Sequence, residues 1–337
     1  MSTVHKHATN VSSRNRLFTP TPVNIKVNNM AEPSTSWKER IEPDEAERFS
    51  READVIGAIQ QKYSRLYQCP GKAFHRKQLL AAEAVFEVLD GLPPYARFGV
   101  FAQPRQYDGL VRLSNGNWGI ENDEKPDIRG FAIKILGIEG PDARSGSPTN
   151  EHNILMVHMD PLGTDSSGFV SLVQKAAAGE LHGDSALAPT FSGFAVESFH
   201  TQTPFCVGPY AARGRLIPPR DQRVDTNGVH GWGADVVARL PLTWEYQLQF
   251  YVNDDDTPID DASRVWNESA SPYVTVARLT IPAQDITGRW SDEINDRTFL
   301  LWDALEEHRP LGEVNRARRV VMDRSVRNRT GPNKLGK

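Results

Sequence analysis

Cysteine is scarce in this sequence, which has only Cys69 and Cys206 among its 337 residues. Two cysteines this far apart form neither a disulfide framework nor a set with metal-ligand spacing. Long hydrophobic runs are also missing: no stretch of eighteen apolar residues occurs, so we expect no membrane span. A large excess of either charge is missing too: the formal net charge is -4, which gives no reason to expect nucleic acid as a partner.

Acidic residues are absent from the start of the chain, where no Asp or Glu precedes Glu32. Four prolines interrupt any helix in this region: Pro20, Pro22, Pro33 and Pro43. Residues 1–43 are therefore expected to form a flexible N-terminal arm, and residues 44–337 a single domain. The acid-poor start also fits an organellar transit peptide, so we expect a cytoplasmic location and keep an organellar one as the alternative.

What is present is ordinary for a soluble globular protein, with 39% hydrophobic and 24% charged residues. Residues 44–67 are predicted to be a helix, because apolar residues recur at helical spacing after an acidic start. Those residues are Phe49, Val55, Ile59, Tyr63 and Leu66. The stretch from about residue 73 fits either a helix or an extended segment that leads into the apolar run 85–89.

Six short runs rich in β-branched and large apolar residues, separated by turn residues, predict strands. They are 107–115, 130–138, 153–158, 210–217, 242–252 and 273–281. The run 242–252 is the clearest, because large apolar residues alternate along it. Helices are expected at 165–179 and 295–329. Strands in series with helices outside them predict an α+β fold, an antiparallel β-barrel with peripheral helices.

The most informative stretch lies near the C-terminus, where residues 313–326 contain no Gly or Pro and are predicted to be helical. The Gly-Pro pair at 331–332 then supplies a stop signal. Residues four apart share one face of a helix, so Arg318 lies beside Met322, and Arg329 follows one to two turns later. By itself this pattern is typical of a solvated basic helix, and a methionine on such a helix is usually core filler.

The spacing resembles a motif of haem catalases and their small relatives. In that family an Arg precedes an iron-ligating Tyr by four residues, a second Arg follows the Tyr by seven, and an Arg-x-Arg-x-Gly-x-Asn pattern closes the motif. The residues that match here are Arg318, Arg327, Arg329, Gly331 and Asn333. The departure is Met322, which stands where the family has its ligating Tyr.

Two other stretches carry the most specific resemblance. Residues 111–116 resemble the family's Arg-x-Ser-Asn-Gly signature, and residues 127–134 its Asp-x-Arg-Gly-x-Ala-x-Lys signature. The resemblance covers about residues 45–333, and it is closest to small catalase-related haem proteins such as peroxidases and allene oxide synthases. It implies a catalase-like β-barrel, haem b as the cofactor, and self-association through the N-terminal arm, which would make the protein a homo-oligomer.

The resemblance also assigns roles to charged residues. A buried haem carries two carboxylates, and buried carboxylates require cationic partners. The family pattern gives this role to Lys72, Arg112 and Arg329. The Arg at the place of Arg318 keeps the family's Tyr ionised, since an unperturbed phenol has a pKa of about 10.

The resemblance makes His75 the distal histidine, with Ser114 beside it and Asn153 as an amide that orients the substrate. Before the O–O bond of a peroxide breaks, a proton must move from its inner to its outer oxygen. An imidazole with a pKa near neutrality can take up and return that proton. A single histidine in such a segment is also common as a packed residue.

Met322 leaves three functions open. The first is a haem-dependent, peroxidase-like oxidoreductase that acts on hydrogen peroxide or on organic or lipid hydroperoxides. Its iron would have Met322 as a weak ligand, or would be five-coordinate or bound elsewhere. A thioether is soft and neutral, favours ferrous iron, and argues against efficient catalase turnover. The second is a haem-free pseudoenzyme that binds another small apolar ligand. The third is a haem-free enzyme in which His75 is the acid–base group.

Overall fold

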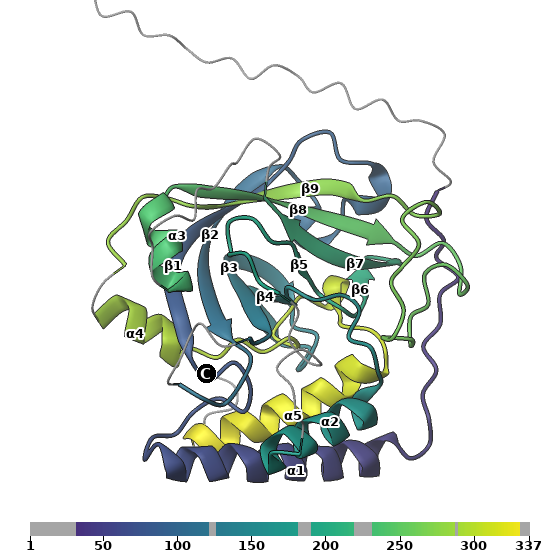
Figure 1. Ribbon diagram of the computed structural model, residues 1–337. Coiled ribbons are helices and arrows are strands. Elements are labelled where there is room, and N and C mark those ends of the chain that lie inside the picture. The colour runs from purple at the N-terminus through teal and green to yellow at the C-terminus, as the bar shows by residue number, and fades with distance from the viewer. Residues whose placement is uncertain (1–31, 121–125, 181–189, 219–230, 287–288, 331–337) are drawn as a thin grey trace, which may run out of the picture. The chain divides into compact units, whose positions relative to one another are not determined.

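The computed structural model describes residues 32–120, 126–180, 190–218, 231–286 and 289–330, and Figure 1 shows its elements. The strands are β1 (Gln78–Val88), β2 (Arg105–Asn115), β3 (Arg129–Pro141), β4 (Pro148–Val157), β5 (Phe199–His200), β6 (Phe205–Val207), β7 (Tyr210–Ile217), β8 (Leu242–Phe250) and β9 (Val274–Ile281). The helices are α1 (Glu45–Leu66), α2 (Ser166–Ala178), α3 (Trp232–Arg239), α4 (Arg289–Asp296) and α5 (Glu313–Thr330). Short 3-10 turns are η1 (Pro94–Ala96), η2 (Gly99–Phe101) and η3 (Glu306–His308).

Eight of the strands close into a barrel. Neighbouring strands run antiparallel in the order β5-β4-β3-β2-β1-β9-β8-β7, and β5 also pairs with β7, which closes the ring. The short strand β6 pairs with the first part of β7 and lies outside this ring. A closed ring leaves few unpaired strand edges. The predicted α+β fold, an antiparallel barrel with peripheral helices, is therefore confirmed.

Side chains that point into the barrel form its largest core. On β8 the large residues alternate as predicted, and each of them is buried: Leu242, Trp244, Tyr246, Leu248 and Phe250. Phe131 of β3 packs edge-on against Trp244 and Phe199, with ring centroids 5.4 Å and 5.1 Å apart. Such contacts join side chains from opposite sides of the barrel and fill its interior, so the barrel holds a packed core rather than an open channel.

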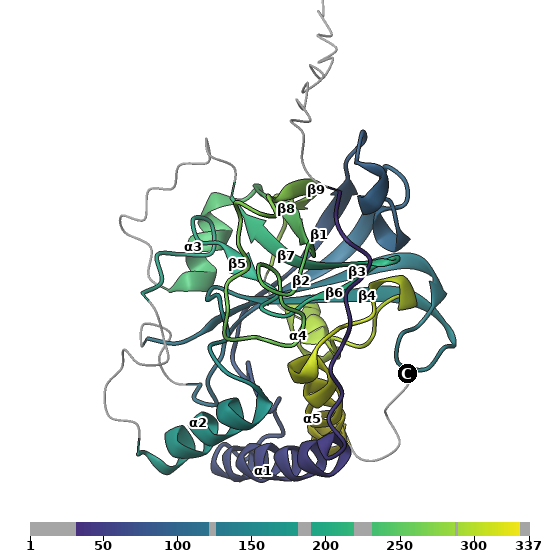
Figure 2. The same ribbon diagram turned by 90° about the vertical axis from the view of Figure 1, so that its right-hand side faces the viewer.

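Helices α1, α2 and α5 lie together on one side of the barrel (Figures 1 and 2). Between α1 and α5, Nδ2 of Asn328 donates to Oε1 of Gln60 at 3.1 Å, and Nε2 of Gln60 donates to the carbonyl of Ser325 at 3.0 Å. Gly57 permits this close approach, because a Cβ there would lie 3.1 Å from Nδ2 of Asn328. This packing fixes α5 beside α1.

The six predicted strands correspond to β2, β3, β4, β7, β8 and β9, and the helices predicted at 44–67 and 165–179 correspond to α1 and α2. The stretch after residue 73 is extended rather than helical, and it leads into β1 at Gln78. The sequence did not predict α3, β5 or β6, which have eight, two and three residues. Elements this short carry little periodicity of their own.

The helix predicted over 295–329 is wrong in its first half. Helices α4 and α5 are separated by residues 297–312, which are irregular apart from η3. Pro310 lacks a backbone donor, and Gly312 adopts a left-handed conformation with φ of 88°. These two residues explain why α5 cannot begin earlier.

Residues 32–43, which belong to the expected arm, contact the barrel domain. The indole Nε1 of Trp37 donates to the carbonyl of Pro209 at 2.9 Å. The Glu39 carboxylate pairs with the guanidinium of Arg316 at 2.6 Å. The described part of this segment therefore lies against the domain.

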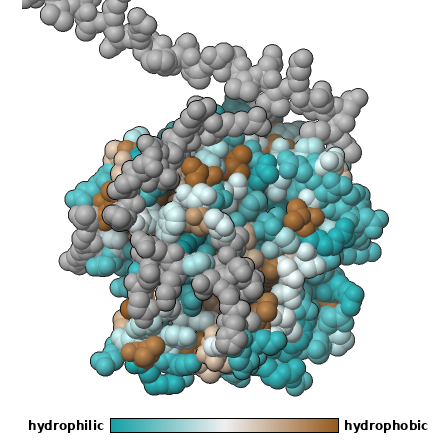
Figure 3. All heavy atoms as spheres, viewed as in Figure 1, coloured by the Kyte–Doolittle hydropathy of each residue, from teal (hydrophilic) through white to brown (hydrophobic). Residues whose placement is uncertain are grey.

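On the face drawn in Figure 3, apolar side chains lie in small separate groups among hydrophilic ones. The large apolar residues exposed among the described residues are distributed along the chain: Ile41, Leu66, Ile120, Val196, Val237, Val265 and Val320. Scattered exposed apolar residues are normal for a protein surface. Within the described ranges, no helix combines the length and the apolar character needed to cross a membrane.

Candidate functional site

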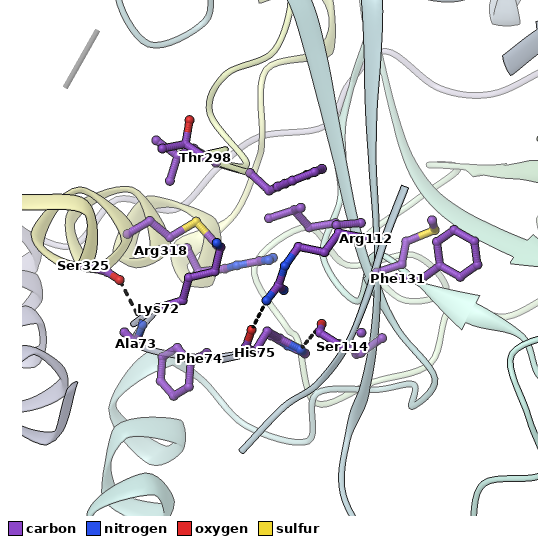
Figure 4. A pocket seen from close by; sticks show the side chains of 18 of the residues that line it. Lys72, Ala73, Phe74, His75, Arg112, Ser114, Phe131, Thr298, Arg318 and Ser325 are labelled. Carbon is purple, nitrogen blue, oxygen red and sulfur yellow. Dashed lines mark hydrogen bonds between the residues drawn. The ribbon is translucent and has the colours of Figure 1, made fainter. Parts of the chain in front are cut away.

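A cavity of about 140 Å³ lies between the barrel and α5 (Figure 4). Strands β2, β3 and β4 form one wall, the segment 72–75 and residues 298–300 form others, and α5 closes the site. The polar residues that line it are Lys72, His75, Arg112, Ser114, His200, Thr201, Gln202, Thr298, Arg318, Ser325 and Arg329. Its larger apolar residues are Phe74, Phe131, Leu155, Met156, Val157, Phe299, Leu300, Val321, Met322 and Val326.

His75 is held by contacts on both its backbone and its ring. Its N–H donates to the carbonyl of Gly116 at 3.1 Å, and its own carbonyl accepts from Nη2 of Arg112 at 2.8 Å. The ring Nδ1 lies 3.1 Å from Oγ of Ser114. The residue has a φ of 54°, a left-handed conformation that non-glycine residues seldom adopt and that often marks a functional position.

Gly130 supports the imidazole of His75 from the neighbouring strand. Ser114 and Gly130 are opposite each other in the pairing of β2 with β3. A Cβ on Gly130 would lie 2.5 Å from Nδ1 of His75 and 2.9 Å from Oγ of Ser114. Only glycine therefore leaves room for the ring at this position.

The environment of His75 keeps its imidazole neutral. Burial, together with the positive charges of Arg112 and Arg318, lowers the pKa of the ring to about 3. The ring borders the cavity, so part of its surface is uncovered, but it lies deep within the domain. A neutral imidazole has one nitrogen free to accept a proton.

Three cations of the cavity meet at the C-terminal end of α4. Lys72 Nζ donates to the carbonyl of Asn295, and Arg112 Nε donates to the Asn295 side-chain oxygen at 3.1 Å. Arg329 Nη1 donates to the carbonyl of Asp296 at 3.2 Å. Burial, reinforced by the charges of Arg112 and Arg329, lowers the pKa of Lys72 to about 6.

Arg318 and Met322 project toward the cavity from successive turns of α5. Figure 4 shows Arg318 on the α5 side, across the cavity from the His75–Ser114 pair. Its guanidinium is 3.3 Å from Oδ1 of Asn315, and burial lowers its pKa to about 10. Met322 thus borders the same space as a buried cation.

Within the described part of the chain, the cavity lining includes four cationic side chains and no Asp or Glu. Burying cations without carboxylate partners is costly in free energy. The rest of the lining is largely apolar. A site of this composition is suited to a ligand that combines an apolar body with one or more negative charges.

The structure brings seven of the eight predicted site residues together around this cavity: Lys72, His75, Arg112, Ser114, Arg318, Met322 and Arg329. Asn153 is the exception. It lines a separate cavity of about 20 Å³, and its Nδ2 donates to the carbonyl of Leu300 at 3.0 Å. The motif residues Gly331 and Asn333 lie outside the described residues.

Among the lining residues that sequence reasoning missed are His200 and Met156. His200 comes from the two-residue strand β5, and its Nδ1 lies 3.7 Å from a carboxylate oxygen of Asp160. Met156 lies on β4 and brings a second thioether to the site. No motif signalled either residue, because each reaches the site through strand pairing alone.

No protein-family model matches the sequence, and no curated protein matches it. Solved structures do: a fungal catalase aligns with a TM-score of 0.61 at 13% identity, over 80% of this chain and 61% of that one. Catalase A from Saccharomyces cerevisiae aligns at 0.57 and 12% identity, over 80% of this chain and 64% of the other. A bacterial catalase aligns at 0.58 and 11% identity, over 94% and 68%.

These similarities establish that the fold is the catalase fold, with its closed antiparallel barrel and outer helices. The chain spans less than two thirds of the length of the first two of these catalases. Within the described residues, no group of three His, Cys, Asp or Glu side chains is placed to hold a metal ion.

Proposed function

We propose that this protein is a haem-dependent, peroxidase-like oxidoreductase that acts on hydrogen peroxide or on organic or lipid hydroperoxides. One observation carries the proposal. One cavity beside a catalase-fold barrel is lined by the His75–Ser114 pair and by four cationic side chains, with no Asp or Glu among the described lining residues. Arg318 and Met322 line it from the facing helix, α5.

The donor set of the cavity fits a haem. Lys72, Arg112 and Arg329 come from three different elements and supply the cations that two haem carboxylates require. Met322 supplies a thioether, a ligand type that haem iron accepts in other proteins. The enclosed volume of about 140 Å³ is smaller than the roughly 300 Å³ of typical ligand sites, so a haem would need one wall to move.

A bound haem would supply the redox chemistry, and the chain would supply binding and proton transfer. With Nδ1–H of His75 donating to Ser114, the other ring nitrogen is free to take a proton from the inner peroxide oxygen and return it to the outer one. At a pKa of about 3 this base is weak. A ligand carboxylate against Arg112 would offset one of the charges that lower the pKa.

Met322 sets the expected rate. A neutral thioether stabilises oxidised iron less well than an anionic phenolate does, and Arg318 has no negative ligand atom at Met322 to stabilise. We therefore expect slow peroxide turnover rather than efficient catalase activity. The cytoplasmic location and self-association through residues 1–43 stay predictions.

The second candidate function is a haem-free protein that binds a small apolar anion. The size of the cavity favours it, because about 140 Å³ is close to the 150 Å³ cavity that accommodates benzene in an engineered protein. In this case the cations would bind a carboxylate, and Met322 would be part of the apolar lining. A haem-free enzyme with His75 as its acid–base group would share this architecture.

Haem titration separates the two candidates. Purified protein is mixed with haem, and the Soret band and the haem content per chain are measured, followed by turnover of hydrogen peroxide and an organic hydroperoxide. The proposal predicts near-stoichiometric haem and slow turnover. Protein that takes up no haem at any concentration contradicts the proposal and leaves the binding function.

Three variants test the assigned roles in the haem-loaded protein. Met322→Leu is expected to change the spectrum and Met156→Leu to leave it unchanged; the reverse result would make Met156 the ligand. His75→Ala is expected to lower turnover at least about 100-fold while haem content stays the same. Unchanged turnover in His75→Ala would remove His75 from the mechanism.

A further inference from the structure

The C-terminal end of α4 accepts hydrogen bonds from the cations that an anionic ligand would need. Lys72 and Arg112 both donate to Asn295, and Arg329 donates to the carbonyl of Asp296. The three cations come from an irregular segment, from β2 and from α5. All three line the cavity.

The chain that follows α4 is itself a wall of the cavity. Thr298, Phe299 and Leu300 line it, and Figure 4 shows Thr298 at its edge. We call residues 295–300 the strap. Its far end is held by Asn153, which donates to the carbonyl of Leu300 at 3.0 Å. The near end is bound by the cations and also by apolar packing, because Ile294 is fully buried beside Ala81 and Leu110, and Phe299 of the strap packs against the same cluster. The contacts that a ligand could replace are therefore the polar ones at Asn295 and Asp296.

The bonds to the strap are weaker than those a carboxylate would make. Carbonyl and amide oxygens are neutral acceptors, and the C-terminus of a helix adds only a partial negative charge. A carboxylate brings a full negative charge, so a cation bound to it gains an ion pair, often in two-pronged geometry for Arg, in addition to the hydrogen bond. No acidic side chain of the described residues lines the cavity. The carboxylate of Asp296, on the strap, acts on Lys72 and Arg329 through its charge, but the hydrogen bonds of the strap to the cations come from neutral oxygens.

We propose that the strap is a closure that a carboxylate-bearing ligand displaces from Lys72, Arg112 and Arg329. The displacement frees the cations and enlarges the cavity in the same movement. This inference rests on the proposed function where the ligand is haem. It also accounts for the small volume of the cavity, because the wall that must move is bound to the cations by hydrogen bonds that a carboxylate can replace.

Amide hydrogen exchange tests the displacement with a matched pair of ligands. Iron-free protoporphyrin IX carries two carboxylates, and its dimethyl ester carries none. The porphyrin is expected to speed exchange in the last turn of α4 and the strap roughly tenfold, the equivalent of one net hydrogen bond. The ester is expected to leave it unchanged. Binding of the porphyrin without faster exchange, or equal effects of the two, would overturn the proposal.

A strap variant provides a second readout. Asn295→Ala removes the side-chain acceptor of Arg112 and is expected to speed porphyrin association several-fold. Asp292→Asn, an exposed change on the first turn of α4, is the control and is expected to leave the rate unchanged. Equal association rates for Asn295→Ala and the wild type would contradict a closing role for the strap.

Failure of the proposed function and failure of the strap give different results. Protein that binds neither haem nor protoporphyrin rules out the haem function. The strap is then tested with dodecanoate and dodecanol, which share a chain and differ in the carboxylate. Faster exchange with dodecanoate alone supports the strap, and no effect of any carboxylate overturns it.

Discussion

The imidazole Nδ1 of His75 and the hydroxyl Oγ of Ser114 lie 3.1 Å apart. His75 lies in the irregular segment before β1, and Ser114 lies near the end of β2. Gly130 of β3 faces both groups from the paired position of the next strand. The backbone register of the barrel thus fixes the orientation of an imidazole that has no ion-pair partner among the residues the structure describes.

Ser114→Ala is expected to lower peroxide turnover of the haem-loaded protein by about 10- to 100-fold, because His75 loses the contact that fixes its tautomer. Haem content should not change. Ser271→Ala is the control: it removes another buried serine hydroxyl, which bonds to the carbonyl of Phe250. If the two variants lose the same activity, Ser114 has no role beyond stability.

Arg318→Met is expected to raise the free energy of unfolding of protein purified without haem, by about 1–2 kcal/mol, since it removes a buried cation with no carboxylate partner at the cavity. The same change should weaken the binding of anionic ligands. Urea denaturation measures the first effect and porphyrin titration the second.

Arg316→Met is the matched control for that change. Two residues before Arg318, the guanidinium of Arg316 pairs with Glu39 at 2.6 Å and with Glu45 at 2.7 Å. Removing it leaves the largely buried Glu45 without this ion pair, whereas Glu39 keeps its pair with Arg309 at 3.0 Å, and it should lower the free energy of unfolding by about 3 kcal/mol. A loss of stability in both variants would show that Arg318 has a structural partner.

The stability of the protein is expected to fall on acidification. Burial lowers the pKa of His75 to about 3 and that of His308 to about 4, and it lowers the pKa of His152 well below the ordinary value. These residues bind protons in the unfolded chain below about pH 6.5 but not in the folded one. Each therefore lowers the free energy of unfolding by up to about 1.4 kcal/mol per unit of pH decrease. Asp303 has the opposite effect, because its pKa is raised to about 6 and it takes up a proton in the folded protein at a higher pH than in the unfolded chain. On acidification it therefore raises the free energy of unfolding, with the slope that one proton gives.

His308→Gln isolates one of these contributions. Val100 N–H donates to Nε2 of His308, and Nδ1 of His308 lies 3.0 Å from the carbonyl of Cys206. A glutamine can replace both bonds without titrating. Urea denaturation between pH 7 and pH 4.5 should show an acid slope that is shallower by about one proton in the variant. Parallel slopes would mean that His308 titrates normally.

The sequence predicted the barrel and most of the site for a physical reason. Strand alternation identified runs such as 242–252, and the motifs around Ser114 and Gly130 lie on strands that pair directly. Local patterns suffice where neighbouring strands follow one another in the chain. They fail for the closure of the ring, which depends on the two residues of β5, Phe199 and His200.

The placement of Asn153 was not predictable from its motif context. It lies on β4, where the face that a side chain takes depends on the register with β3, in which it pairs with Lys134. Nor does the sequence indicate that the end of α4 would bind three cations, because two of the three contacts, those of Lys72 and Arg112 with Asn295, join residues more than 180 positions apart. Long-range contacts of this kind have no local signal.

Met322→Tyr tests whether the cavity still provides the environment of an ionised phenol. Burial raises the pKa of a phenol, whereas a cation one helical turn away lowers it. Arg318 has no carboxylate partner at the cavity, so its charge should prevail and bring the pKa of the introduced phenol about 1–3 units below the ordinary value of about 10. Ultraviolet titration against the wild type, which cancels the eight native tyrosines, measures this pKa.

The double variant Arg318→Met, Met322→Tyr identifies the source of the shift. Without the guanidinium only burial acts on the phenol, so its pKa should rise above about 10. A lower phenol pKa in the single variant than in the double variant would mean that the charge of Arg318 still stabilises an anion, as an anionic iron ligand requires. Met322 would then be the one residue that distinguishes this site from a phenolate-binding one. Equal pKa values in the two variants would show that Arg318 acts on other groups of the cavity, and would favour a haem-free anion site.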